Sequence, residues 1–256
     1  MKKLAVFLAF LFTANVNAGA IYLDSTIGNP WGQSNNESSM DGVFGAGNWL
    51  DSTFEAVDLM TLFSATTDFI YLEGGDSNAE ALETFLLANK VALENWVAAG
   101  GRLLLNAAPN VGNGMSFGFG VTLNYDGLTT FDNDVHAANA GHAIFTGPYG
   151  NTGSVFGGNS FSHATVSGAG LNQLIIGDNT NGTVLADKSW GNGYAMFGGM
   201  TTLNFQYPDS EALRKNILHY AANVNNNVAP APVPVPATIA LFALGLAGLG
   251  FSRRRA

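Results

Sequence analysis

The amino-acid sequence predicts an α/β protein of the flavodoxin-like or Rossmann-like kind, a sandwich with a mainly parallel central sheet and some added antiparallel strands. Two stretches lead to this prediction. Residues 69–105 have the pattern of a strand, a helix and a second strand, and residues 174–197 contain three short apolar runs separated by Asn-Gly pairs. A βαβ unit places its strands parallel with a right-handed crossover, whereas Asn-Gly pairs predict hairpin turns.

The first half of the chain supplies most of the expected parallel strands. Apolar runs at 20–23 and 54–57 predict two of them. The aromatic and branched run at 69–72, followed by Glu73 and two glycines, predicts a third strand that is buried on both faces.

A long helix follows, which Asp76, Ser77 or Asn78 can cap. Its apolar face consists of Leu82, Phe85, Leu86, Leu93, Trp96 and Val97. The glycine pair 100–101 is a typical helix end, and residues 103–105 predict the next buried strand. Later strands are expected at 174–176, 184–186 and 194–197, with turns at 181–182 and 192–193 and a closing helix at 209–222.

Composition and charge restrict the function. Only 11% of the residues are charged, against about 25% in typical soluble domains. Cysteine is absent, which excludes disulfides, zinc–thiolate sites and cysteine nucleophiles. Residues 19–236 carry five basic and nineteen acidic side chains, a net formal charge of −14. This charge repels phosphate groups, so we expect neither nucleic acid nor anionic lipid as a partner.

Residues 1–18 have the three parts of a secretory signal peptide. Lys2 and Lys3 precede an apolar run at 4–12, and small residues near Ala18 predict cleavage after that residue. The apolar run is shorter than the about 20 residues that span a bilayer, and the alternative interpretation is a buried N-terminal helix.

Near the C-terminus, an uncharged apolar stretch at 237–251 precedes a run of three arginines. As a single hydrophobic helix it would be about 22 Å long, against about 30 Å of bilayer hydrocarbon, which predicts a marginal membrane anchor. This order of parts at 233–256 resembles the PEP-CTERM sorting signal of Gram-negative bacteria, although Val235 stands where that motif has Glu. The sorting residues would be Pro234, Val235, Pro236, Arg253, Arg254 and Arg255.

The resemblance implies a transient partner, an exosortase-type membrane protease that removes the tail near the motif. The protein would be anchored in the inner membrane before processing and would then reach the cell surface or the extracellular matrix of a bacterium that makes exopolysaccharide. The alternative is an ordinary C-terminal anchor. A linker rich in Pro and Asn at 225–236 would connect the tail to a folded domain at 19–224.

Several segments of the domain resemble the class I glutamine-amidotransferase-like fold in its ThuA-like branch. They are DFIYLEGG, ENWVAAGGRLLLNAAP, GHAIFTGP, and GNGYAMFGG with LRKNILHYAANV. In the catalytic branch of that family, the strand after the long helix leads to a nucleophilic Cys. The corresponding residues 105–109 have neither thiol nor hydroxyl, so the resemblance implies that ammonia release from glutamine is lost.

Polar residues follow two of the expected parallel strands. Glu73, Asp76 and Asn106 fall at the carboxyl ends of strands, where open α/β sheets bind ligands. Glu73 could act there as a base or accept a hydrogen bond from a sugar hydroxyl. The alternative is a capping role for Asp76 and solvent exposure for Glu73.

A second polar group is a candidate metal site. Asp132, Asp134 and His136 alternate, so a strand would place them on one face, with His142 nearby. Carboxylates and imidazoles bind divalent metals and polarise water. The alternative is a solvated acidic loop. No cofactor is expected.

Two other signals are weaker. Ser116 lies in a G-x-S-x-G sequence, but the hydrolase motif needs a strand before the serine and a helix after it, and a strand is expected to follow here. Trp31, Trp49 and Trp190 flank loops rich in Gly and Asn, a setting that suits stacking on sugar rings or a hydrophobic lid. His163 has no partner that the sequence identifies.

Two functions remain open. The first is an exported, non-catalytic surface or matrix protein that binds polysaccharide or neighbouring proteins. The second is a ThuA-like carbohydrate-processing hydrolase that uses carboxylate, histidine or metal chemistry.

Overall fold

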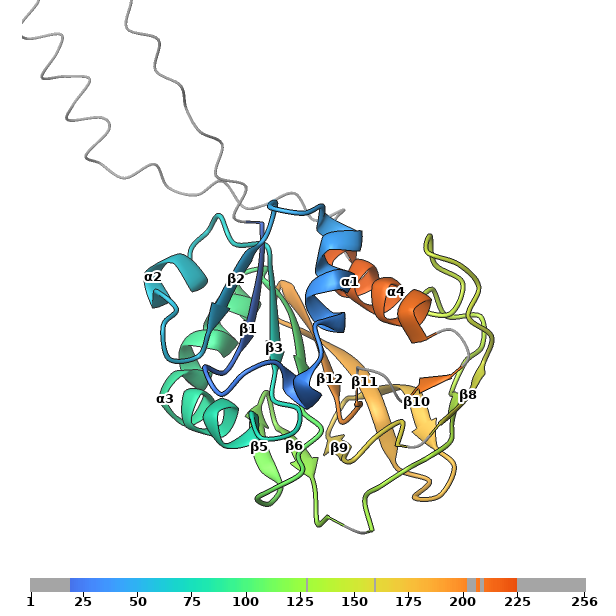
Figure 1. Ribbon diagram of the computed structural model, residues 1–256. Helices are drawn as coiled ribbons and strands as arrows, with labels where there is room; N and C mark the ends of the chain where they lie inside the picture. The colour runs from blue at the N-terminus through green and yellow to red at the C-terminus, as the bar shows by residue number, and fades with distance from the viewer. Residues whose placement is uncertain (1–18, 128, 159, 202–205, 208–209, 225–256) are drawn as a thin grey trace, which may run out of the picture. The chain divides into compact units, whose positions relative to one another are not determined.

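A mixed sheet runs through the folded domain (Figure 1). Its strand order in the described residues is β13-β8-β7-β10-β11-β12-β4-β3-β1-β2. The computed structural model describes residues 19–127, 129–158, 160–201, 206–207 and 210–224. The expected signal peptide with its cleavage at Ala18, the linker at 225–236 and the tail at 233–256 lie outside these residues.

One half of the sheet is parallel and contains the predicted βαβ unit. Its strands are β2 (Leu50–Thr53), β1 (Ala20–Asp24), β3 (Phe69–Glu73), β4 (Arg102–Asn106) and β12 (Gly193–Gly198). The helix α3 (Ala79–Ala98) connects β3 to β4. Every residue of β1 and β3 is buried, as expected of strands that are covered on both faces.

The other half of the sheet is antiparallel and is larger than the sequence predicts. Its strands are β11 (Thr183–Trp190), β10 (Asn172–Gly177), β7 (Val135–Ala137), β8 (Val155–Gly158) and β13 (Gln206–Tyr207). The expectation of a mainly parallel sheet is therefore corrected to a mixed one. The short strands β7, β8 and β13 carry too few apolar residues for their pattern to be recognised.

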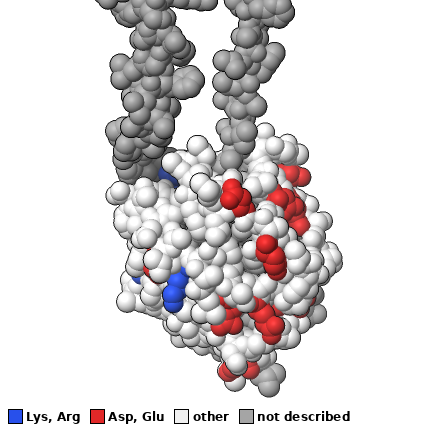
Figure 2. Space-filling view, turned by 90° about the vertical axis from the view of Figure 1, so that its left-hand side faces the viewer, with Lys and Arg blue, Asp and Glu red and all other residues white. Residues whose placement is uncertain are grey.

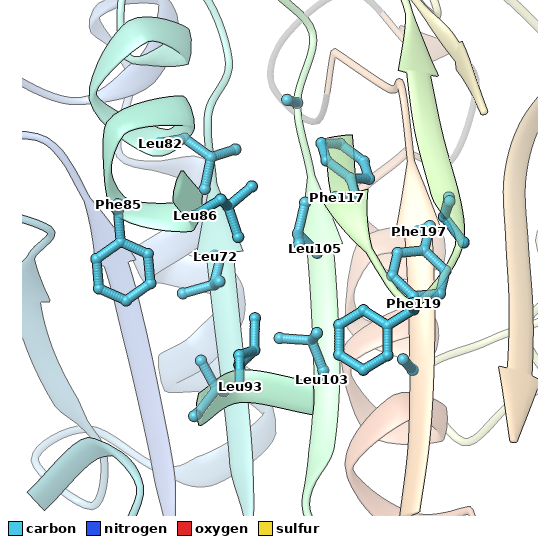
Figure 3. Packing of buried hydrophobic residues seen from close by; sticks show 14 of the residues in the cluster. Leu72, Leu82, Phe85, Leu86, Leu93, Leu103, Leu105, Phe117, Phe119 and Phe197 are labelled. Atoms are coloured by element: carbon cyan, nitrogen blue, oxygen red, sulfur yellow. The ribbon is translucent and has the colours of Figure 1, made fainter. Parts of the chain in front are cut away.

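A small second sheet lies on the same face as α3. It contains β5 (Met115–Gly118), β6 (Val121–Asn124) and β9 (Thr165–Gly168), all antiparallel. Figure 3 shows Leu82, Phe85, Leu86 and Leu93 of α3, with Phe117 of β5 and Phe119 of the turn that follows it, beside the strands that carry Leu72, Leu103, Leu105 and Phe197. One hydrophobic core therefore fills the space between the large sheet, α3 and the small sheet.

Two helices cover the opposite face of the sheet. They are α1 (Asn35–Phe44) and α4 (Ser210–Asn223), and they pack on a second core that includes Tyr22, Tyr71 and Ile217. The closing helix is confirmed, whereas α1 has a polar sequence with few apolar residues and was not predicted. The short helix α2 (Leu59–Leu62) begins at Asp58, whose side chain accepts hydrogen bonds from two backbone amides.

One predicted strand is misplaced. The sequence predicts a strand at 54–57, but the strand is β2 and ends at Thr53. Phe54 was its strongest apolar residue, and it is buried just beyond the strand end. In the described ranges, no helix is both long enough and apolar enough to cross a membrane.

Candidate functional site

The carboxyl ends of the parallel strands meet at one edge of the sheet. Asp24 ends β1, Glu73 ends β3, Asn106 ends β4 and Gly198 ends β12. Glu73 and Asn106 are paired in register on neighbouring strands. Open α/β sheets bind ligands at this kind of edge, and we call it the carboxyl edge.

Glu73 and Asn106 form a buried hydrogen-bond network with Tyr71. The hydroxyl of Tyr71 donates to Glu73 Oε2 at 2.6 Å, and Asn106 Nδ2 donates to Oε1 and Oε2 at 3.2 and 3.0 Å. Glu73 is 1% exposed and Asn106 is 0% exposed. The structure therefore brings these two residues together, and the alternative of an exposed Glu73 is wrong.

The side chain of Asn106 also binds the segment that follows β12. Its Nδ2 donates to the carbonyl of Met200 at 2.8 Å, and its Oδ1 accepts from the Met200 amide at 3.0 Å. A Cβ at position 198 would lie 2.5 Å from Asn106 Oδ1, so this close approach depends on glycine at that position. Asn106 thus links the ends of β3, β4 and β12.

Acidic side chains of β1, β2 and α1 lie beside this network. Asp24 is 6% exposed, and its burial, reinforced by the negative charges of Glu37, Asp51 and Glu73, raises the pKa of its carboxyl to about 7. Burial also raises the pKa of Glu37 and of Asp51.

Two groups on the α1 and α4 face complete this environment. Burial and the nearby carboxylates of Glu73 and Asp24 hold the pKa of the Tyr22 hydroxyl well above its usual range, and Asn36 of α1 donates to that hydroxyl at 3.3 Å. Arg214 of α4 interacts electrostatically with Tyr71, and burial lowers the pKa of its guanidinium. Carboxylates at the strand ends and the partly exposed Arg214 of α4 therefore lie near the buried Tyr22 and Tyr71.

Asp76 lies at the outer side of the carboxyl edge and does not cap α3. The N-cap of α3 is Asn78, whose side chain instead accepts from the Ser25 amide and donates to the Gly28 carbonyl. Asp76 has a left-handed backbone with φ 54°, its amide donates to the Ala108 carbonyl, and its Oδ1 accepts from the Asn110 side chain at 3.3 Å. The capping alternative for Asp76 is therefore wrong.

His163 belongs to the same edge, which the sequence did not reveal. Its Nδ1 lies 3.1 Å from the carbonyl of Pro109, and its ring centroid lies 4.8 Å from that of Trp31 and 5.1 Å from that of Phe131. Burial lowers the pKa of the imidazole, which the Pro109 carbonyl and the Asp76 charge partly offset. These partners come from separate loops, so no local pattern could have identified them.

Trp31 of this aromatic group and Glu73 of the buried network both lie next to Gly75. A Cβ on Gly75 would lie 2.8 Å from Glu73 Oε1 and 3.1 Å from Trp31 Nε1, so both side chains approach the backbone at this glycine. Trp49 packs edge-on against Tyr22, and Trp190 packs on Phe119. The lid interpretation suits Trp49 and Trp190, whereas Trp31 stands at the candidate site.

The four residues of the predicted metal site have separate roles. Asp132 is 0% exposed and accepts from the amides of Asn179 and Thr180 and from the Thr180 hydroxyl, at 2.7, 2.9 and 2.6 Å. Asp134 is exposed, His136 pairs with Asp178, and His142 packs on Tyr220.

The local backbone explains why these residues do not come together. Of the alternating residues Asp132, Asp134 and His136, only His136 lies inside strand β7, so they do not share one strand face. Nowhere in the described part of the chain do three His, Asp or Glu side chains gather closely enough to hold a metal ion. Ser116 lies within β5, and a hairpin to β6 follows it in place of the helix that the hydrolase motif requires.

Fold and site together define a mixed α/β protein with a candidate ligand edge at the carboxyl ends of its parallel strands. The comparison with protein families adds that residues 232–255 match the PEP-CTERM protein-sorting motif. A motif of this kind indicates export, anchoring in the membrane before processing, recognition by exosortase, and then a place at the cell surface. No curated protein matches the chain significantly.

Solved structures similar to the chain are distant. A β-galactosidase from Bacillus circulans sp. alkalophilus has 12% identity and a TM-score of 0.48, covering 84% of this chain and 32% of its own. A β-galactosidase from a Rahnella species has 12% identity and a TM-score of 0.47, and the match covers 84% of this chain and 33% of that β-galactosidase. A cytoplasmic protein from Salmonella typhimurium has 12% identity and a TM-score of 0.48, and the match covers 79% of this chain and 98% of that protein.

The chain thus spans about a third of the length of these β-galactosidases. The glutamine-amidotransferase-like family is not among these findings, and that assignment stays a prediction.

Asp24 makes the stability of the domain depend on pH. The pKa of its carboxyl is raised from the usual 3.8 to about 7 in the folded protein. Between about pH 4 and about pH 7 the folded state therefore keeps the carboxyl proton that the unfolded chain has released. The free energy of unfolding should therefore fall across this window. Asp24→Asn should remove the part of that fall that Asp24 causes, so the variant's free energy of unfolding relative to the wild type should rise with pH in urea denaturation.

The matched control is Asp58→Asn. The Thr61 hydroxyl and the Met60 amide lower the pKa of Asp58, so its contribution to stability is present above pH 3.8 and lost below it. Between about pH 4 and about pH 7 the difference between this variant and the wild type should stay constant. An Asp24→Asn difference that is equally constant would contradict the assigned pKa.

Asp132 should act as a structural anchor of the turn at 178–181. Asp132→Ala leaves the donors of Asn179 and Thr180 without their acceptor, so the free energy of unfolding should fall by about 2–4 kcal/mol. Asp134→Ala, at an exposed position, should change it by less than about 0.5 kcal/mol. A rise in the wild-type melting temperature on adding calcium chloride, abolished by both substitutions, would instead support a metal site.

Proposed function

We propose that this is an exported, non-catalytic surface or extracellular-matrix protein whose C-terminal tail an exosortase-type protease recognises and removes. The observation that carries the proposal is the PEP-CTERM motif at 232–255. Residues 1–18 would direct export, the domain at 19–224 would act outside the inner membrane, and the linker at 225–236 would give the protease access to the tail.

The buried network supports a non-catalytic role. A general base must reach the proton that it removes, at hydrogen-bond distance from the substrate. Glu73 is 1% exposed, and its carboxylate is held by Tyr71 and Asn106. It therefore stabilises the strand ends rather than facing a substrate.

The alternative is a ThuA-like carbohydrate-processing hydrolase. The observation in its favour is that Asp76 and His163 interact electrostatically at the carboxyl edge, where an acid and a base would be needed. Such an enzyme would lose turnover of a sugar derivative in Asp76→Asn and in His163→Gln, two substitutions that leave the Glu73 network in place.

The proposal is tested by the intact mass of the protein recovered from its native host, with membranes and culture fluid measured separately. We expect a chain that begins at Gly19 and ends near 234–236, because the signal peptide and the tail are both removed. Replacing Arg253, Arg254 and Arg255 with Gln should leave an unprocessed chain in the membrane fraction, since the basic stop of the motif is lost. A wild-type mass that still includes the three arginines would contradict the proposal.

A further inference from the structure

The loops at the carboxyl edge carry an unusual share of strained backbone. Among the described residues, five that are not glycine have a positive φ. Three of them, Trp31 with φ 59°, Asp76 with φ 54° and Ser160 with φ 125°, lie on loops that meet at this edge, while the other two lie in hairpin turns. A left-handed backbone is unfavourable for a bulky side chain such as that of Trp31. Strain of this kind concentrates at ligand sites, where it holds a side chain in place.

Two of these residues, Trp31 and Asp76, belong to a mixed aromatic and polar surface. The His163 ring packs against both Trp31 and Phe131, and all three residues are partly exposed. Asp76 and the exposed Asn110 adjoin them, because the Asp76 backbone pairs with Pro109, whose carbonyl lies 3.1 Å from His163 Nδ1. We call this surface the aromatic edge site; its members are Trp31, Asp76, Asn110, Phe131 and His163.

This combination of groups matches the chemistry of a sugar. One face of a pyranose ring presents C–H groups, which pack on the electron-rich face of an aromatic ring. Its hydroxyls lie around the rim and need both donors and acceptors, which the Asn110 amide and the Asp76 carboxylate supply. Small-ligand sites commonly combine such apolar walls with a few polar groups that set orientation.

The negative charge of the domain favours uncharged sugars over anionic ones. Residues 19–236 carry nineteen acidic and five basic side chains. Figure 2 shows several acidic side chains and few basic ones on the face that it presents. Within the site itself, Asp76 is acidic and burial keeps the pKa of His163 below its usual value, which favours the neutral imidazole. An anionic polysaccharide would be repelled, so the favoured ligand is uncharged.

We propose that the aromatic edge site binds a neutral glycan, with Trp31 and Phe131 packed on sugar rings and Asp76 and Asn110 hydrogen-bonded to hydroxyls. The proposal rests on the proposed function in one respect, since a chain of sugars is met outside the inner membrane. It goes beyond that function by naming the ligand class and the residues that hold it.

The test is calorimetric titration of the full chain with maltohexaose, cellohexaose, laminarihexaose and mannohexaose, and with a hexamer of galacturonic acid as the anionic comparison. The chain is kept in a detergent without a sugar headgroup, because a maltoside would compete for the site. We expect binding of at least one neutral hexasaccharide and none of the anionic one. Failure of all four neutral sugars to bind would overturn the proposal, as would tighter binding of the anionic one.

Trp31→Gly and Phe131→Ala locate the site. Glycine adopts the backbone of position 31 without strain, so Trp31→Gly removes the ring while keeping the loop conformation accessible. Each substitution should weaken binding about tenfold, as expected for the loss of one aromatic contact. The matched control is Trp190→Ala, which removes a partly exposed indole that packs on Phe119 elsewhere. Equal weakening in the control, or unchanged affinity in both site variants, would contradict the assignment.

A separate measurement distinguishes this inference from the proposed function. The Trp31→Gly chain should reach the cell surface with the same mature mass as the wild type, because the site takes no part in sorting. Loss of glycan binding with normal delivery supports the site. Normal delivery of a wild-type protein that binds no neutral glycan would overturn the site and leave the proposed function intact.

Discussion

The side chain of Asn106 joins the ends of three parallel strands, and the architecture of the carboxyl edge depends on it. It donates to Glu73 on β3 and exchanges two hydrogen bonds with the backbone of Met200 after β12. All of these groups are buried, so each would lose a hydrogen-bond partner if the side chain were removed.

The residues that hold the strand ends differ from those that lie at the surface of the carboxyl edge. Glu73 and Asn106 lie beneath the surface and hold the strand ends, whereas Trp31, Phe131 and His163 lie at the edge and are partly exposed. Burial, together with the negative charges of Glu37, Asp51 and Glu73, raises the pKa of Asp24, because a carboxylate is costly to bury.

The sequence predicted the features that follow from local pattern. The βαβ unit follows from an apolar period and a glycine stop, and the meeting of Glu73 with Asn106 follows from two parallel strand ends. His163 and Phe131 were missed because loops far apart in the chain bring them to Trp31. The metal prediction assumed one continuous strand through Asp132 and His136, but the turn at 178–181 engages Asp132.

The central claim is that Asn106 holds the carboxyl edge, and native-state hydrogen exchange tests it most directly. In the full chain, Asn106→Ala should speed exchange at the Met200 amide and the neighbouring residues at the strand ends, while the antiparallel strands keep their protection. Leu105→Ala, a core change beside it, serves as the comparison for general destabilisation. Exchange that rises equally throughout the domain in both variants would contradict the claim.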